Sequence, residues 1–458
     1  MRDLSFALVW MALLPLTFMS AHVGVLLWIW VALLSPGELL YGFMAGVPFN
    51  KIVAVITLGL IAVSREKKDL YLDGTALLLV LFGVAATISW YGGIVSTPDA
   101  TDLYQKVLKE LVLAFAIMAV MTTRHRIHLV VLTVAISYGF LAVKEGLIFL
   151  LTGGGHKVLG TGSVGDNNSL AAALLMTIPM IYYLARYSAV RFVRIGLLAA
   201  LGLAVVTVIA TFSRGGFVGL MVVGLFMVKN SRNKFGSLVL VAATGVLIYL
   251  LAPESWFERL NTINDVSDDG SFMGRVVAWK ISWLIAMDHP LFGGGMHAVQ
   301  RLLNWDTYRP FLYLLDGVVK TPPADTMPHA AHSTYFEVLG DMGFIGLALF
   351  LGVLGLAFWN CRSIIRMGRR HPSLAWAVDL GRMLQITLVV YCVTTALLSM
   401  GYFELLYVVV ALLSRCRRTV RLALAAQQSA QQTPAKPLPA GAALPAFATA
   451  SRRAASPG

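Results

Sequence analysis

Long apolar runs separated by short polar segments repeat along most of the chain, from Leu4 to Leu413. A membrane-spanning helix needs about 20 mostly apolar residues, and many of the runs approach this length. They predict an all-α polytopic membrane protein. Beyond the first 63 residues, we expect spans near 72–92, 107–122, 127–151, 168–185, 195–212, 215–228, 235–252, 343–361, 381–400 and 402–414.

The first 63 residues contain three further apolar runs, at 4–19, 22–35 and 50–63. With Arg2 in the cytoplasm they must supply an even number of crossings, so we expect one run to be short, broken or re-entrant. The total is then about 12 spans with both termini cytoplasmic. A cleaved signal peptide is the competing interpretation of the first run, but Asp3 directly follows Arg2 and no clear cleavage site is present.

The charges support this topology. Basic residues gather in short segments that are separated by two spans each, and such clusters mark the cytoplasmic side. The net charge of +13 is therefore a topology signal, and we do not expect nucleic-acid binding. One long polar stretch then faces outward. We expect an N-terminal transmembrane bundle (1–252), an outward catalytic loop with interfacial helices (253–342), C-terminal spans (343–424) and a disordered cytoplasmic tail (425–458).

An arginine stands at the outward turn between two expected spans, in the sequence Ser213-Arg214-Gly215-Gly216. The glycines let the backbone approach closely, and the free N–H groups and dipole of the helix that begins here favour an anion such as phosphate. The alternative is an arginine that extends to the lipid headgroups.

A second arginine opens a run that is too short and too polar at its start to span the membrane. Arg275, Trp279 and Trp283 are four residues apart and share one helical face. Because tryptophan prefers the membrane interface, we expect a helix lying on the membrane with Arg275 at headgroup depth. A guanidinium group binds phosphate bidentately; a purely anchoring helix is the alternative.

Two histidines precede the next span. His332 is a candidate general base, and His329 stands three residues before it. Tyr335 and Glu337 follow as possible supporting residues. Zinc bound by the two histidines with Asp325 or Glu337 is a weaker interpretation, because no paired metal motif is present, and a structural histidine that caps the helix is a third. We expect no metal and no cofactor.

A polar element, Asp166-Asn167-Asn168, precedes the span near 168–185 and ends a glycine-rich outward loop. Capping of the next helix is the favoured role, and contact with a sugar is the alternative. The chain has no GxxxxGK nucleotide loop, so a transferred group must come from an activated donor outside the cytoplasm.

Taken in order, these motifs resemble the O-antigen ligase and polymerase superfamily over nearly the whole chain up to about residue 415. The beginning of the chain and the asparagine-containing element resemble the branch of exosortase-associated O-glycosylation ligases. The motifs are Ser213-Arg214-Gly215-Gly216, Gly274-Arg275-x-x-x-Trp279, Pro290-Leu-Phe-Gly-Gly-Gly295 and His332-Ser333-x-Tyr335, with Leu26-Leu27-Trp28-Ile29-Trp30 and Asp166-Asn167-Asn168 for the branch.

The resemblance implies a metal-independent, inverting glycosyltransferase of the GT-C type in the bacterial inner membrane, active on the periplasmic side. Its partners would be an undecaprenyl-diphosphate-linked glycan, a hydroxyl acceptor such as lipid A–core oligosaccharide, and the membrane lipids. Arg214 and Arg275 would bind the donor diphosphate, and His332 would deprotonate or orient the acceptor hydroxyl. Trp279, His329, Tyr335, Glu337 and Asn168 are possible supporting residues. An O-antigen polymerase and a protein O-oligosaccharyltransferase use the same chemistry.

A secondary transporter or flippase for an anionic lipid or sugar is the alternative from another functional class. Such proteins place ionisable groups near the bilayer midplane and often have two similar halves. Here the arginines and the histidine are expected at the outward face, and the two halves of the chain are unlike.

Overall fold

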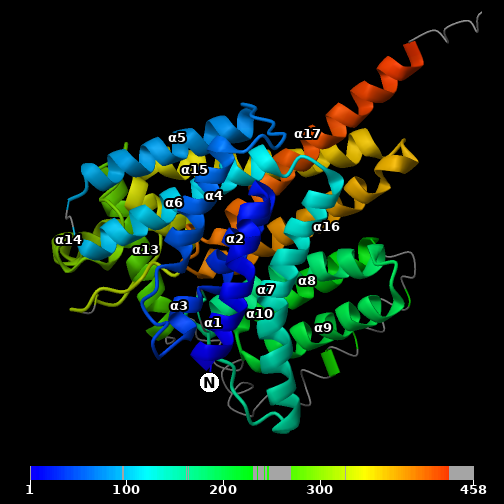
Figure 1. Cartoon of the computed structure of the whole chain (residues 1–458). Helices are drawn as coiled ribbons and strands as arrows, with labels where there is room; N and C mark the ends of the chain where they lie inside the picture. Colours follow the sequence, from blue (N-terminus) through cyan, green and yellow to red (C-terminus); the bar gives the residue numbers. More distant parts are fainter. Residues whose placement is uncertain are drawn as a thin grey trace, which may run out of the picture. The chain divides into compact units, whose positions relative to one another are not determined.

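The computed structural model describes residues 2–94, 97–160, 162, 164–230, 270–324 and 326–432, together with isolated positions between 231 and 250. The expected span at 235–252, the beginning of the outward loop up to residue 269, and the tail from residue 433 therefore lie outside the described residues. The regular elements of the described part are helical, which confirms the predicted all-α class (Figure 1). The chain divides into two units, residues 1–420 and 421–458.

The N-terminal half forms helices close to the predicted runs. The 3-10 helix η1 continues α1, so the two form one apolar stretch. The elements are α1 (Arg2–Leu13), η1 (Leu14–Met19), α2 (Ala21–Leu34), α3 (Pro36–Leu39), α4 (Phe49–Val63), α5 (Gly74–Tyr91), α6 (Pro98–Val120), α7 (Arg124–Leu151), α8 (Asn167–Tyr187), α9 (Arg191–Ala210) and α10 (Arg214–Asn230).

The C-terminal half contains the described part of the polar stretch 253–342 and three long helices. Helix α17 crosses from the first unit into the second and continues to Gln432, so residues 425–432, which were predicted to be disordered, are helical. The elements are α13 (Gly270–Asp288), η3 (Ala298–Gln300), α14 (Leu302–Tyr308), η4 (Arg309–Leu315), α15 (Thr334–Gly368), η5 (Pro372–Leu374), α16 (Ala375–Thr394), η6 (Thr395–Leu397) and α17 (Glu404–Gln432).

Seven stretches of the described residues are long and apolar enough to cross a membrane: Arg2–Met19, Gly74–Tyr91, Arg124–Leu151, Asn167–Tyr187, Arg191–Ala210, Thr334–Gly368 and Pro372–Leu397. The chain is thus a polytopic helical membrane protein, although the described residues do not support the expected count of about 12. Helices α2 and α4, with 14 and 15 residues, reach only about 21 and 22 Å at 1.5 Å per residue, which is short of a hydrocarbon core of about 30 Å.

Hydroxyl groups and small residues join the long helices. The Thr207 hydroxyl on α9 donates to the Ala142 carbonyl of α7 at 2.7 Å, and the Thr387 hydroxyl on α16 donates to the Met176 carbonyl of α8 at 2.9 Å. Within an apolar environment such bonds and close backbone approaches hold helices together. These bonds join α7 to α9 and α8 to α16, and α7, α8 and α9 flank the turns before α8 and α10.

Helix α15 contains a kink that separates its polar start from its apolar body. Gly343 has a φ of 65° and a ψ of −165° inside the helix. Its N-terminal turns, before the kink, extend the predicted span back to Thr334. This part of α15 carries polar side chains, so hydropathy alone detects only the segment after the kink.

Candidate functional site

The turn between α9 and α10 presents Arg214 at the first position of α10, where the residue is exposed. The hydroxyl of buried Ser213 caps the helix by accepting from the Gly216 amide at 3.1 Å. A Cβ at Gly216 would lie 3.1 Å from the Ala171 side chain of α8, so α10 packs closely against α8 at this position. Phe212, just before the cap, has a left-handed φ of 51°. The turn is therefore built to hold one conformation.

The start of α8 is tied to this turn. Asp166 caps α8 by accepting from the amides of Asn168 at 2.8 Å and Ser169 at 3.1 Å. The Asn167 side-chain amide donates to the Thr211 carbonyl at 2.8 Å. These bonds confirm the predicted capping role of this element and bring it next to the Arg214 turn.

Helix α13, which carries Arg275, is fixed to the segment that carries His332. The Trp279 indole N–H donates to the Ala331 carbonyl at 2.7 Å. Its ring stacks on Phe336 of α15, with centroids 5.2 Å apart and planes inclined by 6°. Arg275, one helical turn before Trp279, is half-buried. The tryptophan thus fixes the arginine-bearing helix to the segment of the histidine.

His332 is held in an unusual backbone conformation with part of its imidazole open to solvent. Its φ of 43° lies in the left-handed region, which costs non-glycine residues on the order of 1–3 kcal/mol. Partial burial lowers the pKa of His332 below its ordinary value, Arg275 and His329 lower it further, and Asp166 opposes the shift. The charges of Arg275, Asp166 and His329 therefore all act on the imidazole, and the net effect favours its neutral form, which can accept a proton.

His329 packs edge-on against the ring of Trp305, with centroids 5.6 Å apart, and Trp305 is fully buried. This packing joins the segment before His332 to the core of the outward loop. Among the residues that the structure describes, no three His, Cys, Asp or Glu side chains are arranged to hold a metal ion. Asp325, a ligand in the zinc interpretation, lies outside the described residues.

The other two supporting candidates have partners in the C-terminal helices. The Tyr335 hydroxyl donates to the Cys392 carbonyl of α16 at 3.0 Å, and the Glu337 carboxylate accepts from the Gly401 amide at 2.8 Å. Both bonds hold the first turns of α15 against α16 and the connection to α17. These contacts position the helix that follows His332.

The backbone of the glycine triplet Gly293–Gly295 packs against the backbone at the kink in α15. The Gly294 and Gly295 amides donate to the carbonyls of Gly340 and Asp341 at 2.9 and 3.0 Å. At Gly293, where φ is +68°, an added Cβ would lie 2.5 Å from the Asp341 carbonyl. The sequence motif is thus explained by close backbone approach.

Two charged residues in this region escaped the sequence analysis. Asp341 accepts from the Ala298 amide at 2.9 Å and from the Tyr402 hydroxyl at 3.1 Å, so it organises the loop around the kink. Lys280, only 6% exposed, pairs with Asp316 at 2.7 Å. A charged side chain inside an apolar run was the available signal for both.

Residues 199–351 match the O-antigen ligase family. This segment carries an O-antigen ligase domain. It confirms the predicted superfamily, and it includes Arg214, the whole of α13 and the beginning of α15 with His332. Residues 1–189 match a family of unknown function (DUF5935), and the Asp166 cap belongs to that part. No curated protein matches the chain. The O-antigen ligase domain therefore contains both arginines and the histidine, and the preceding segment contains Asp166, whose charge acts on His332.

Proposed function

We propose that the chain is an O-antigen ligase-type glycosyltransferase that transfers a glycan from undecaprenyl diphosphate to a hydroxyl of lipid A–core oligosaccharide, on the periplasmic side of the bacterial inner membrane. The main support is one juxtaposition within the O-antigen ligase domain. Trp279 bonds the helix of Arg275 to the segment of His332, and His332 experiences the charge of Arg275. An O-antigen polymerase and a protein O-oligosaccharyltransferase remain alternatives with the same chemistry.

In this proposal the acceptor oxygen attacks the anomeric carbon of the donor sugar, opposite the diphosphate. The carbon–oxygen bond to the diphosphate breaks, so the configuration at that carbon inverts. His332 takes the proton from the acceptor hydroxyl and so acts as the general base. Arg214 and Arg275 bind the diphosphate and stabilise its developing charge, which guanidinium groups do bidentately and without a metal.

The proposed topology places residues 253–342 in the periplasm. Twelve spans are reached if α6, α10, the run at 235–252 and α17 cross as well as the seven candidates, together with one of α2 and α4. Cysteine labelling of exposed turns from either side of sealed vesicles tests this arrangement. Labelling of the α14–η4 region from the cytoplasmic side would contradict it.

Transfer by purified protein in liposomes, with a lipid-linked donor and a defined acceptor, tests the function. We expect Arg214→Ala and Arg275→Ala each to lower kcat by about 100- to 1,000-fold, the usual effect of removing one preorganised donor to a developing anion. Arg370→Ala, at an exposed position beyond α15, is the matched control. Near-normal product from either site variant would refute the diphosphate role.

Three further measurements separate the alternatives. His332→Ala should lower transfer more than His329→Ala, and the reverse order would move the base to His329. Strong inhibition by chelators would restore the zinc interpretation. Counterflow of substrate without glycan transfer would favour the transporter, and in a deletion strain a core bearing one repeat would indicate a polymerase, whereas a bare core indicates a ligase.

A further inference from the structure

The outward loop has a small core of its own beside α13. One side of α13 packs against α14, η3 and η4, and the buried residues are Val277, Ala278, Ile281, Ile285, Ala298, Val299, Trp305, Tyr308 and Leu312. The ammonium group of Lys280 reinforces this packing by donating to the Asp316 carboxylate at 2.7 Å and to the Thr321 hydroxyl at 3.1 Å. The segment after η4 is thereby held against η4 and leaves a hollow between them.

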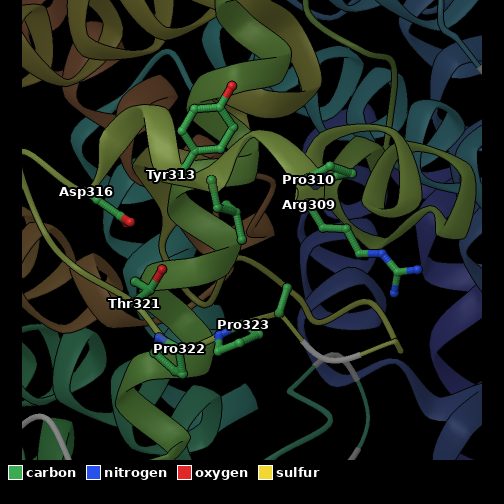
Figure 2. Close-up of a pocket in the computed structure, with 9 residues that line it drawn as sticks. Arg309, Pro310, Tyr313, Asp316, Thr321, Pro322 and Pro323 are labelled. Atoms are coloured by element: carbon green, nitrogen blue, oxygen red, sulfur yellow. The ribbon is translucent and has the colours of Figure 1, made fainter.

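This hollow is a pocket of about 420 Å³, which is within the range of small-molecule sites. Figure 2 shows residues of η4 and of the segment after it surrounding the pocket. The lining residues with polar or ring groups are Arg309, Pro310, Tyr313, Asp316, Thr321, Pro322 and Pro323.

The lining has the chemistry that recognises a sugar. Tyr313 is 63% exposed, so its ring offers an apolar face with a polar hydroxyl at its edge. The Asp316 side chain is 39% exposed although it pairs with Lys280, and the Arg309 side chain is 35% exposed. Charged groups form the stronger hydrogen bonds, and a sugar hydroxyl both donates and accepts. The proline rings add rigid apolar surface.

The pocket is separate from the proposed diphosphate site. Lys280, which organises the pocket, follows Arg275 by five residues, which places it about 140° further around α13 at 3.6 residues per turn. Arg275 and Trp279 belong to the side of α13 that meets α15 and the His332 segment. The two sites therefore occupy different flanks of one helix, and the pocket suits a part of the substrate away from the reacting bond.

We propose that this pocket is a saccharide subsite that holds a sugar unit of one of the two glycan substrates away from the point of transfer. The inference rests on the proposed glycosyltransferase function and adds the place where the chain recognises the glycan itself. The bound sugar unit could belong to the lipid-linked donor glycan or to the core oligosaccharide of the acceptor, because both present sugar hydroxyls.

The test measures glycan binding separately from transfer. Saturation-transfer NMR on the full chain in nanodiscs would use two probes: core oligosaccharide released from lipopolysaccharide by mild acid, and the glycan released from the lipid-linked donor. We expect Tyr313→Ala to raise the Kd for one of them by about 3- to 10-fold, the equivalent of one lost aromatic contact. Tyr313→Phe keeps the ring and should bind nearly as the unmodified chain.

Phe311→Ala is the matched control, because Phe311 lies on the same element, is 46% exposed and does not line the pocket. In transfer assays Tyr313→Ala should raise the KM for the substrate carrying that glycan and leave kcat nearly unchanged. Equal effects of Tyr313→Ala and Phe311→Ala, or no effect of either, would overturn the subsite even if Arg275→Ala still abolishes transfer. Tyr313-dependent binding by a chain that transfers no glycan would support the subsite and overturn the proposed function.

Discussion

Trp279 offers the sharpest test of how the site is assembled, because it connects two elements without being proposed to touch the reacting atoms. Replacement by phenylalanine keeps an aromatic ring to pack on Phe336 and removes the N–H that donates to the Ala331 carbonyl at 2.7 Å. Ala331 is only 2% exposed, so its carbonyl has little access to water as a substitute partner. We therefore expect Trp279→Phe to loosen the segment that carries His332.

The size of the effect follows from the bond that is lost. Leaving a buried acceptor without a partner costs about 1–3 kcal/mol, and 1–2 kcal/mol changes a population ratio by about 5- to 30-fold. If the segment must be docked for transfer, kcat should fall by at most that factor, because kcat follows the docked fraction and the fraction lost depends on how strongly the unmodified chain favours docking. The KM for the lipid-linked donor should change little, because both arginines remain. Trp279→Ala also removes the stacking and should lower kcat further.

The assay is reconstituted transfer with kcat and KM determined separately, together with the thermal unfolding temperature of each variant. Trp283→Phe is the control, since Trp283 lies on the same face of α13 and meets Phe344 edge-on at 5.5 Å. It should keep kcat even if it loses some stability. An unchanged kcat in Trp279→Phe, or an equal loss in Trp283→Phe, would refute the positioning role.

Three other predictions concern pH and stability. The pKa of His332 lies below its ordinary value of 6.5, and the negative charge of Asp166 opposes that shift. Asp166→Asn should therefore keep the helix cap and lower the pKa of His332 further, which moves the acid limb of the kcat/KM profile to lower pH. A move to higher pH would contradict the role of His332 as the base. Gly293→Ala should destabilise the fold by about 2–5 kcal/mol, since it combines a left-handed φ with a backbone overlap, whereas Gly317→Ala has open space and should leave the unfolding temperature nearly unchanged. Hydrogen bonds from Arg418 and Arg415 of α17 lower the pKa of Asp69 to about 2 against the opposing effect of burial. The ionised Asp69 should therefore stabilise the fold above pH 4, and this contribution should be lost as the pH falls toward 2. Asp69→Asn should lower the unfolding temperature at pH 7 and flatten its dependence on acid pH.

The hydrophobic pattern predicted helices well where one helix lies in an apolar environment along its whole length. Helices α5, α7, α8 and α9 begin and end close to the predicted runs. Helix α15 begins at Thr334 rather than near residue 343, because its first turns carry polar groups that are satisfied by partners elsewhere in the chain. Hydropathy measures the cost of exposing these groups to lipid and contains no information about such partners.

The sequence suggested candidate residues one by one, but it did not indicate which of them the fold connects. The types and order of Arg214, Arg275 and His332 suggested their chemistry. The Trp279–Ala331 bond, between residues 52 positions apart, joins the helix of Arg275 to the segment of His332, and Asp166 acts electrostatically on His332. No periodicity in the sequence encodes such distant pairs. For the same reason the sequence did not indicate that Trp279 and Trp283 of α13 pack against Phe336 and Phe344 of α15.

The turn before α10 and the segment before α15 each contain a residue with a strained backbone conformation. Phe212, two residues before Arg214, and His332 itself both have left-handed φ values, 51° and 43°, and each costs on the order of 1–3 kcal/mol. Such conformations persist only where surrounding contacts determine them. At the first turn those contacts include the Asn167–Thr211 bond, and at the second the Trp279–Ala331 bond. Each bond joins its turn to a long helix, α8 at the first turn and α13 at the second, so the backbone positions of Arg214 and His332 are set by the helices and do not depend on a bound ligand.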